Sequence, residues 1–142
     1  MDRLACSAAS LERDPLPDAK AWRGIKDRRA RLATGLAAIY AWYARNEQLA
    51  GCVLRDAESH ALVQEIVALR YGPHLAEYEK ILGERMAAGR RALLRVALGY
   101  PTWRSLTRDS GLSAAAAVSS TPESGRRGRR GGLRCTPSML LT

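Results

Sequence analysis

AAIYAWYARNEQLAGCVLRDAE, residues 37–58, contains two apolar segments that a polar break at Asn46-Glu47 separates. The first segment is rich in aromatic residues, and the second ends in charged residues. Apolar residues spaced three and four positions apart are typical of a helix that buries one face. This part of the chain therefore predicts two consecutive amphipathic helices.

The helix before the break carries an apolar stripe made of Leu32, Leu36, Ile39, Tyr40 and Tyr43. Asp27 can cap its N-terminus by accepting hydrogen bonds from free backbone N–H groups. Tyr40 and Tyr43 share the apolar face, whereas Trp42 points elsewhere, so core packing would leave one aromatic ring exposed. A short helix over residues 18–25 is expected to precede it.

Two helices are predicted between residues 47 and 71. The first runs to about residue 57 and places Cys52 as a small buried apolar residue. The second starts at a Ser59 cap and ends at Gly72-Pro73, because proline lacks the N–H that continues a helix. Its buried line would consist of Leu62, Ile66 and Leu69.

Helical spacing continues after Pro73. One helix is expected from His74 to about Ala88, where Gly89 breaks it. The next segment, residues 90–108, is interrupted at Gly99-Tyr100-Pro101, so we expect a kink or two helices there. No stretch alternates apolar and polar residues for long enough to predict a strand. The body of the chain is therefore predicted to be all-α.

Net charge and cysteine content restrict the class of protein. The formal charge is +9, and residues 111–142 hold five arginines against the single acidic residue Glu123. Three cysteines without a CxxC pair favour reduced thiols in the cytosol. The longest uncharged apolar stretch, residues 32–44, is too short to span a bilayer. We therefore expect a cytoplasmic protein without a membrane segment.

Residues 114–142 differ in composition from the body and predict a disordered Arg/Gly/Ser-rich tail. From residue 119 to residue 138 only Leu133 and Cys135 are apolar. The arginines of this segment could contact phosphates, but no aromatic residues accompany them for base stacking. A small basic nucleic-acid-associated protein is therefore an alternative function, beside a tail with no selected role. The arginines concerned are Arg126, Arg127, Arg129 and Arg130.

Four segments of the chain resemble the C-terminal effector-binding and dimerisation domain of TetR-family transcriptional repressors. They are CSAASLERDPLPDAKAWRGI, LATGLAAIYAWYARNEQLAGCVLRDAE, LLRVALG and WRSLTRDSGLS, and they cover roughly residues 4–113. The resemblance implies an antiparallel helical bundle over residues 1–113 that dimerises through its last helices. It also implies a pocket between the middle helices for a small apolar effector, and no cofactor.

Two sets of candidate binding residues accompany this resemblance. Aromatic side chains offer a ligand an apolar face and a polar tip. The candidate pocket residues are Leu36, Tyr40, Tyr43, Val53, Tyr78 and Trp103. The candidate dimerisation residues are Leu93, Leu94, Ala97 and Leu106, and the expected partner is a second copy of the chain or an intact paralogue.

The chain departs from the TetR pattern at both ends. The family places a helix-turn-helix domain ahead of this region, and the first 26 residues, with Pro15 and Pro17, cannot supply one. After GLS the family continues with an acidic amphipathic helix, where this chain has AAAAVSSTPESGRRGRRGG. We hypothesise a gene that is truncated at its start and frameshifted near residue 113.

Such a product would bind a ligand or a partner subunit but would not by itself bind DNA with sequence specificity. Pro101 also falls where the family keeps a more continuous helix, which would shorten the dimer-forming helices. A ligand-sequestering helical module without a transcriptional role is a further alternative.

The sequence contains no arrangement that predicts catalysis or metal binding. Asp56, Glu58 and His60 are close together, but Ser59 is expected to break the helix between them, and a site needs three or four ligands. No Ser/His/Asp or Cys/His arrangement has motif support, and the chain has only two histidines as general bases. We therefore expect neither an enzyme nor a metalloprotein.

Overall fold

Every regular element between residues 13 and 120, the part that the computed structural model describes, is helical. The all-α prediction is confirmed for these residues. None of their helices has both the length and the apolar character that a membrane crossing requires. In chain order the elements are the 3₁₀ helix η1 (Ala19–Trp22), α2 (Arg28–Arg45), α3 (Glu47–Ser59), α4 (Ala61–Leu82), α5 (Ala88–Ala97), α6 (Tyr100–Arg104), the π-helical η2 (Ser105–Asp109) and α7 (Ala114–Ser119).

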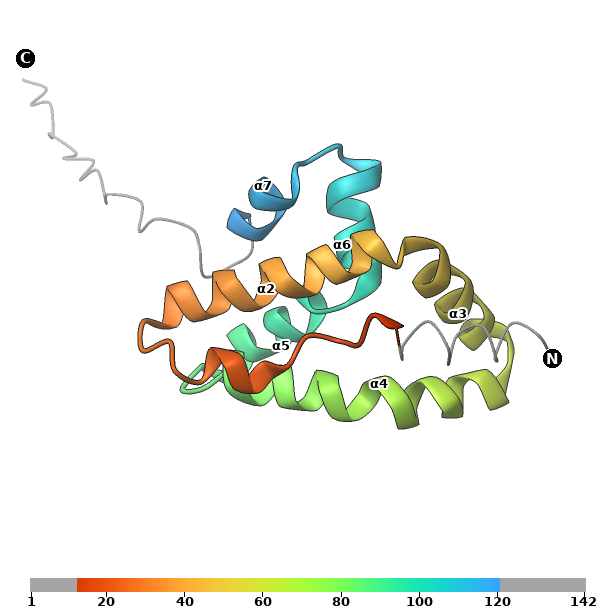
Figure 1. Cartoon of the computed structure of the whole chain (residues 1–142), viewed down its shortest axis with the longest axis horizontal. Coiled ribbons are helices and arrows are strands. Elements are labelled where there is room, and N and C mark those ends of the chain that lie inside the picture. The colour runs from red at the N-terminus through yellow and green to blue at the C-terminus, as the bar shows by residue number, and fades with distance from the viewer. Residues whose placement is uncertain (1–12, 121–142) are drawn as a thin grey trace, which may run out of the picture.

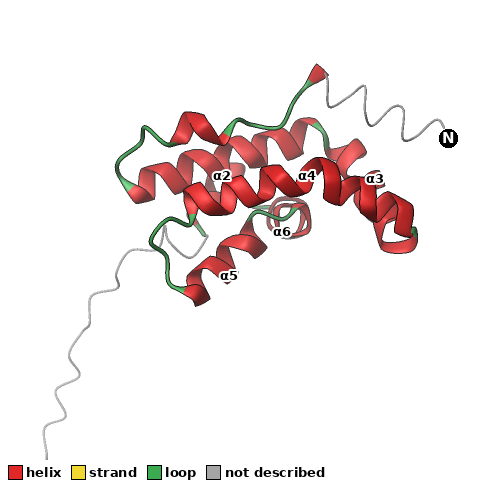
Figure 2. Ribbon diagram, turned by 90° about the horizontal axis from the view of Figure 1, so that it is seen from below, coloured by secondary structure: helices red, strands yellow, loops and turns green. Residues whose placement is uncertain are grey.

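Helix α2 is the central element of the fold (Figure 1). It runs antiparallel to α4, and α3 connects these two helices at one end. Helix α5 packs against α4, and α6 packs against both α2 and α5. Figure 2 shows α5 and α6 from below. Helix α7 contacts α2 on the side away from α4 (Figure 1). Other helices therefore cover α2 on more than one side.

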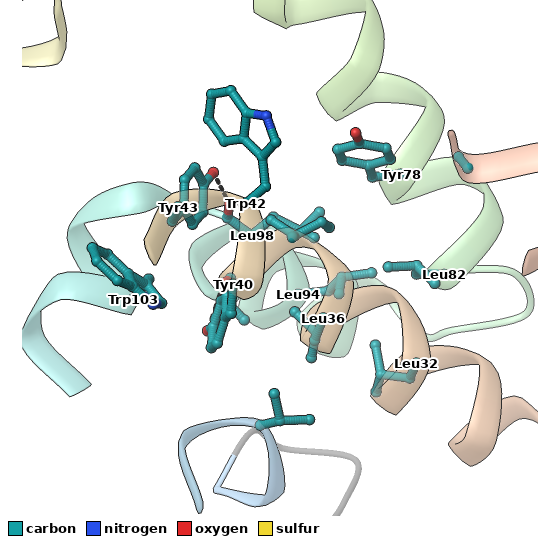
Figure 3. Packing of buried hydrophobic residues seen from close by; sticks show 14 of the residues in the cluster. Leu32, Leu36, Tyr40, Trp42, Tyr43, Tyr78, Leu82, Leu94, Leu98 and Trp103 are labelled. Carbon is teal, nitrogen blue, oxygen red and sulfur yellow. Dashed lines mark hydrogen bonds between the residues drawn. The ribbon is translucent and has the colours of Figure 1, made fainter. Parts of the chain in front are cut away.

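The predicted cap and apolar stripe of α2 are both present. The Asp27 carboxylate accepts a 2.9 Å hydrogen bond from the Ala30 backbone N–H, and all five stripe residues are buried. The expectation of an exposed ring is wrong, because Trp42 is 0% exposed. Figure 3 shows Tyr40 and Trp42 on opposite sides of α2. A helix that is covered on several sides buries more than one stripe.

Two tyrosines of α2 hold the C-terminal end of α5. The Tyr40 hydroxyl donates to the Ala97 carbonyl oxygen at 2.9 Å, and the Tyr43 hydroxyl donates to the Leu98 carbonyl oxygen at 2.7 Å. The last carbonyl groups of a helix have no partner within it, so a buried helix end needs such donors. The Tyr43 bond is drawn as a dashed line in Figure 3.

The predicted interruption near Pro101 is confirmed and takes the form of two helices, α5 and α6. Pro101 lies in the first turn of α6, where its missing N–H costs no helical hydrogen bond. The Thr102 hydroxyl donates to the Val96 carbonyl oxygen at 2.6 Å. The carbonyl groups at the end of α5 thus accept hydrogen bonds from side chains of both neighbouring helices, α2 and α6.

Helix α4 is longer than predicted, because Gly72-Pro73 does not stop it. It runs without a break from Ala61 to Leu82. Pro73 deprives the Leu69 carbonyl of its helical donor, but Leu69 is 76% exposed, and water can replace the missing N–H. The predicted break at Gly89 is also wrong, since α4 ends before Gly83 and Gly89 lies inside α5.

The N-terminal half of α4 does not carry the predicted buried line. Leu62 is 64% exposed and Leu69 is 76% exposed, and Ile66 is only partly buried. Ser59 is not the cap, because α3 extends through it and His60 occupies the N-cap position without a side-chain hydrogen bond. This half of α4 packs on α3, which leaves its outer face exposed.

Helix α3 is more exposed than predicted. Ala50 is its only buried residue. Cys52 is an exposed free thiol, so the expectation that it is buried is wrong. Helix α3 packs against α4, and Cys52 is among the residues of α3 that remain exposed.

The first residues of the predicted tail form helix α7 instead. The Ser113 hydroxyl caps it by accepting a 3.2 Å hydrogen bond from the Ala116 N–H. Ala117 is 0% exposed and Val118 is 7% exposed, because α7 packs on α2. The body of the protein therefore extends past residue 113. Arg126, Arg127, Arg129 and Arg130, with the rest of the predicted tail, lie outside the described residues.

Alkaline pH should destabilise the protein through the tyrosines of α2. Burial raises the pKa of Tyr40 to about 12 and also raises that of Tyr43. In an unfolded chain a tyrosine ionises near pH ~10. The stabilisation from the buried neutral hydroxyls is therefore complete below about pH 10 and is lost as the pH rises toward about 12. Denaturant titrations followed by circular dichroism should show the free energy of unfolding falling across this range, by up to about 1.4 kcal/mol per pH unit for each tyrosine.

The double variant Tyr40→Phe/Tyr43→Phe is the control for this prediction. It removes both ionisable groups, so the alkaline fall should become shallower. The loss of two hydrogen bonds should lower stability at neutral pH by about 1–3 kcal/mol in total. An alkaline slope identical to that of the wild type would show that other groups cause the effect.

Candidate ligand-binding pocket

A cavity of about 160 Å³ lies among α2, α3, α4 and the α5–α6 junction. An apolar cavity of this size accommodates a small organic molecule. The extended segment before η1, which runs between α2 and α4 in Figure 1, supplies a further wall through Leu16. The lining residues include Leu16, Trp42, Tyr43, Val53, Val67, Tyr71, His74, Tyr78, Tyr100 and Pro101.

Aromatic rings form much of the cavity wall. The Trp42 ring lies 5.8 Å from the Tyr43 ring and 6.3 Å from the Tyr71 ring, measured between centroids, and both contacts are edge-to-face. Tyr100 contacts Tyr43 edge-to-face at 5.4 Å. Aromatic pairs at these separations favour tilted and edge-to-face packing. The rings therefore brace one another, and the wall they form is rigid and largely apolar.

Most polar atoms of the aromatic side chains that line the cavity already form hydrogen bonds within the protein. The Tyr78 hydroxyl donates to the Pro17 carbonyl oxygen at 2.5 Å, and the Tyr100 hydroxyl donates to the Glu47 carbonyl oxygen at 3.3 Å. The Tyr43 hydroxyl is engaged at the end of α5. Among residues 13–120, the Tyr71 hydroxyl oxygen is the one buried side-chain nitrogen or oxygen without a hydrogen-bond partner.

The tyrosines of the wall are neutral near pH 7. Burial raises the pKa of Tyr43, of Tyr71 and of Tyr78 above the usual value for tyrosine. Burial also raises the pKa of Tyr100, and the nearby Glu47 carboxylate adds to this effect. Each hydroxyl therefore keeps its proton and can serve as a hydrogen-bond donor.

Residues 14–17, termed the strap, cross one side of the cavity. The Trp42 indole N–H donates to the Asp14 carbonyl oxygen at 2.9 Å. Arg45 donates to the Asp14 carboxylate through two guanidinium nitrogens at 2.9 and 3.2 Å, and the Asn46 amide donates to it at 2.8 Å. At the other end of the strap, Tyr78 holds Pro17. The strap is therefore attached to both α2 and α4.

The structure brings together three of the six predicted pocket residues. Tyr43, Val53 and Tyr78 line the cavity. Leu36, Tyr40 and Trp103 do not line it and are buried elsewhere in the core, with Tyr40 directed at the end of α5.

Sequence reasoning missed several lining residues, among them Leu16, Trp42, Tyr71 and Tyr100. The seven-residue spacing of Tyr71 and Tyr78 on one helix was a usable signal, because it places both rings on the same face. It was obscured by the expectation that Gly72-Pro73 separates them.

The predicted dimerisation residues occupy different environments. Leu94 and Ala97 are each 4% exposed and pack in the core of the chain itself. Leu106 is partly buried against that core, whereas Leu93 is 50% exposed. Of the four, Leu93 is the side chain that offers an apolar surface to another molecule.

Groups suited to metal binding do not converge within residues 13–120. No cluster there contains three or more His, Cys, Asp or Glu side chains that could hold a metal ion. Asp56 and His60 are joined by a backbone hydrogen bond of 2.9 Å at the end of α3, and His60 is already outside that helix.

Loss of the Asp14 carboxylate should release the strap. Arg45 and Asn46 donate hydrogen bonds to this carboxylate and hold its pKa below the usual value. Its stabilising contribution is therefore complete above the pKa of an unfolded aspartate, about 3.9, and is lost as the pH falls through the lower folded value. In Asp14→Ala we expect faster hydrogen exchange of the Trp42 indole N–H, measured by NMR. Acidification of the wild type should have the same effect.

Trp22, whose indole N–H does not donate to the strap, provides the internal control for this measurement. Its indole N–H exchange should change much less than that of Trp42. Equal acceleration at both indoles would instead indicate global destabilisation and would contradict a local role for Asp14.

No family model matches this chain, and no curated protein or solved structure shows a significant match to it.

Proposed function

We propose that the helical body binds one small apolar molecule in the cavity among α2, α3 and α4. The observation that carries this proposal is the cavity of about 160 Å³ behind the strap, lined mainly by aromatic and aliphatic side chains. Ligand pockets are usually concave, largely apolar and supplied with few polar groups. The braced rings of Trp42, Tyr43 and Tyr100 make the site preformed, which lowers the entropy cost of binding.

We further propose that this binding serves a regulator similar to the TetR family. The likeness of residues 4–113 to the effector-binding domain of that family supports the proposal. The position of the cavity among α2, α3 and α4 of this chain also supports it. In such regulators the ligand must bind one arrangement of the subunits better than another, because only differential affinity shifts an equilibrium. The α5–α6 junction could supply this link, since Tyr100 and Pro101 line the cavity and belong to α6.

A partner subunit is part of the same proposal. Apolar side chains are exposed on α4 and α5, where Leu62, Leu69, Leu93 and Val96 are between 50% and 76% exposed. Leu93 and Val96 lie three positions apart on α5 and therefore share one face, and contiguous exposed apolar patches often mark contacts with other proteins. We propose either a homodimer or a heterodimer with an intact paralogue that contributes the DNA-binding domain.

Filling the cavity should weaken ligand binding without unfolding the protein. Val67 lines the cavity, so the larger side chain of Val67→Phe would occupy the space that a ligand needs. With toluene as the probe and tryptophan fluorescence as the readout, to which Trp42 in the cavity wall contributes, we expect saturable binding to the wild type. Binding should weaken by at least about tenfold in the variant, which corresponds to about 1.4 kcal/mol. Leu69→Phe, at an exposed position of the same helix, should bind toluene as the wild type does.

Circular dichroism of both variants checks that they remain folded. Wild-type protein that shows no saturable response to toluene or to a chemically diverse set of small apolar compounds would refute the binding proposal.

The partner proposal has a separate test. Co-expression with a paralogue that carries a helix-turn-helix domain should yield a complex that survives size-exclusion chromatography. Substitution of Leu93 or Val96 by glutamate should reduce complex formation, because a charge would then be buried at the contact. A chain that remains monomeric beside the paralogue and by itself would refute the proposal.

A further inference from the structure

We infer that residues 48–71, termed the flap, form a hinged wall of the cavity that opens as a unit to admit the ligand. The flap comprises most of α3 and the N-terminal part of α4, which pack on each other. Figure 1 shows both at one end of the molecule. The inference rests on the proposed ligand-binding function and adds the way in which a ligand enters. Three properties of the flap support it: its position in the cavity wall, its weak attachment and the irregular backbone at each of its ends.

The flap supplies one of the walls that cover the deepest part of the cavity. Trp42 and Tyr78, which line the cavity from outside the flap, are 0% and 1% exposed. A molecule of the size of toluene therefore reaches these two side chains from solution only when a covering element moves. The lining residues that belong to the flap are Ala50, Val53, Leu54, Val67 and Tyr71.

Few contacts attach the flap to the other helices. Ala50 is its only buried residue, and the buried residues of α4 all follow Pro73. Of the ring contacts described above, only that between Trp42 and Tyr71 joins the flap to another helix. Segments with few buried apolar contacts open at a lower free energy than the rest of a protein.

The polar contacts of the neighbouring segments stop at the edge of the flap. Glu47 binds Arg108 through its carboxylate and Tyr100 through its backbone carbonyl. Among residues 13–120, no ion pair or side-chain hydrogen bond joins residues 48–71 to the other elements. The strap, which also covers the cavity, is held by hydrogen bonds at both Asp14 and Pro17. The flap is therefore the cover that moves more easily.

Each end of the flap adjoins a position where helical structure is weak. At the first end, Asn46 has φ −112° and ψ 24°, and its side chain is fixed to Asp14. At the second end, Pro73 leaves the Leu69 carbonyl without a helical donor. A Cβ atom at the adjacent Gly72 would meet nothing within 4 Å, so this turn of α4 lies against open space. Helices bend at such positions, which makes both ends suitable hinges.

The Tyr71 hydroxyl opposes closure of the flap. Its oxygen is buried and has no partner among the described residues. In the closed arrangement the hydroxyl has thus lost its hydrogen bonds to water without replacing them, which is unfavourable. Opening hydrates the hydroxyl again. The free-energy difference between the open and closed arrangements is therefore smaller than the apolar contacts alone would make it.

Cysteine labelling of the full chain measures the opening without any ligand. In a background with Cys6, Cys52 and Cys135 replaced by alanine, Ala50→Cys reports on the flap and Ala97→Cys on the core outside it. Both alanines are 4% exposed, so each thiol reacts only after its surroundings open. We expect Ala50→Cys to react with the thiol reagent DTNB at least about tenfold faster, which corresponds to ~1.4 kcal/mol in the free energy of opening. Circular dichroism checks that both variants are folded.

Gly72→Ala and Gly89→Ala are a matched pair of variants that test the hinge. Both glycines lie inside helices, and at both an added Cβ atom meets nothing within 4 Å. Alanine favours helical backbone, so Gly72→Ala should slow the labelling of Ala50→Cys about fivefold, the equivalent of the ~1 kcal/mol difference in helix propensity. Gly89→Ala, in α5, should leave this rate unchanged.

Two further variants change the opening by independent means. Pro73→Ala restores an N–H donor to the Leu69 carbonyl, and Tyr71→Phe removes the hydroxyl without a partner. Each should therefore slow the labelling of Ala50→Cys.

Toluene kinetics test the role of the flap in ligand entry. In Gly72→Ala, the association and dissociation rates should both fall about fivefold, because both steps pass through the open arrangement. The affinity should not change. Stopped-flow tryptophan fluorescence measures these rates in a chain that keeps its own cysteines, so this test stands even if a cysteine variant fails to fold.

The outcomes distinguish this inference from the proposed function. Equal labelling rates at positions 50 and 97, or equal slowing by Gly72→Ala and Gly89→Ala, would overturn the hinged flap. If toluene binds and its rates are the same in Gly72→Ala as in the wild type, the ligand enters elsewhere and the inference is wrong, although the cavity binds ligands. If the labelling follows our expectation but toluene does not bind, the flap moves and its role in ligand entry fails together with the proposed function.

Discussion

The hydrogen bonds from Tyr40 and Tyr43 to the end of α5 are the constraint on which the arrangement of the later helices depends. They join the central helix to two consecutive backbone carbonyls that their own helix leaves unpaired. Because α5 ends at this point, the chain turns into α6 and places Tyr100 and Pro101 against the cavity. A single pair of polar contacts inside the core thus positions one wall of the pocket. Low local polarity makes such contacts strong when they are satisfied.

Local signals in the sequence predicted the first part of the fold well, and tertiary contacts account for the errors. The Asp27 cap and the stripe of α2 depend on neighbouring residues alone, so they could be predicted. The burial of Trp42 depends on α4 and the strap, which no local pattern reveals. Pro73 continues α4 because that part of the helix is exposed to water, and helix α7 forms because α2 offers a surface to Ala117.

The candidate site was predictable only in its general composition. Aromatic residues at helical spacing indicated a pocket, and Tyr43 and Tyr78 do line it. Tyr40 could not be separated from Tyr43 by sequence, since the two share a face and differ only in which element covers them. The unpartnered hydroxyl of Tyr71 could not be predicted either, because the lack of a partner among the described residues becomes visible only in the coordinates. The strap residue Leu16 comes from an extended segment with two prolines and no periodic pattern.

The same tyrosine and strap contacts affect how fast the protein can fold. The bonds from Tyr40 and Tyr43 join residues 57 and 55 positions apart, and the bond from Tyr78 to Pro17 joins residues 61 positions apart. Simple helical bundles fold quickly because most of their contacts are local, and closing long loops slows the search. The molecule has the secondary structure of a fast-folding bundle, but these three hydrogen bonds close long loops. Its folding rate should therefore lie below that of an up-and-down helical protein of similar length.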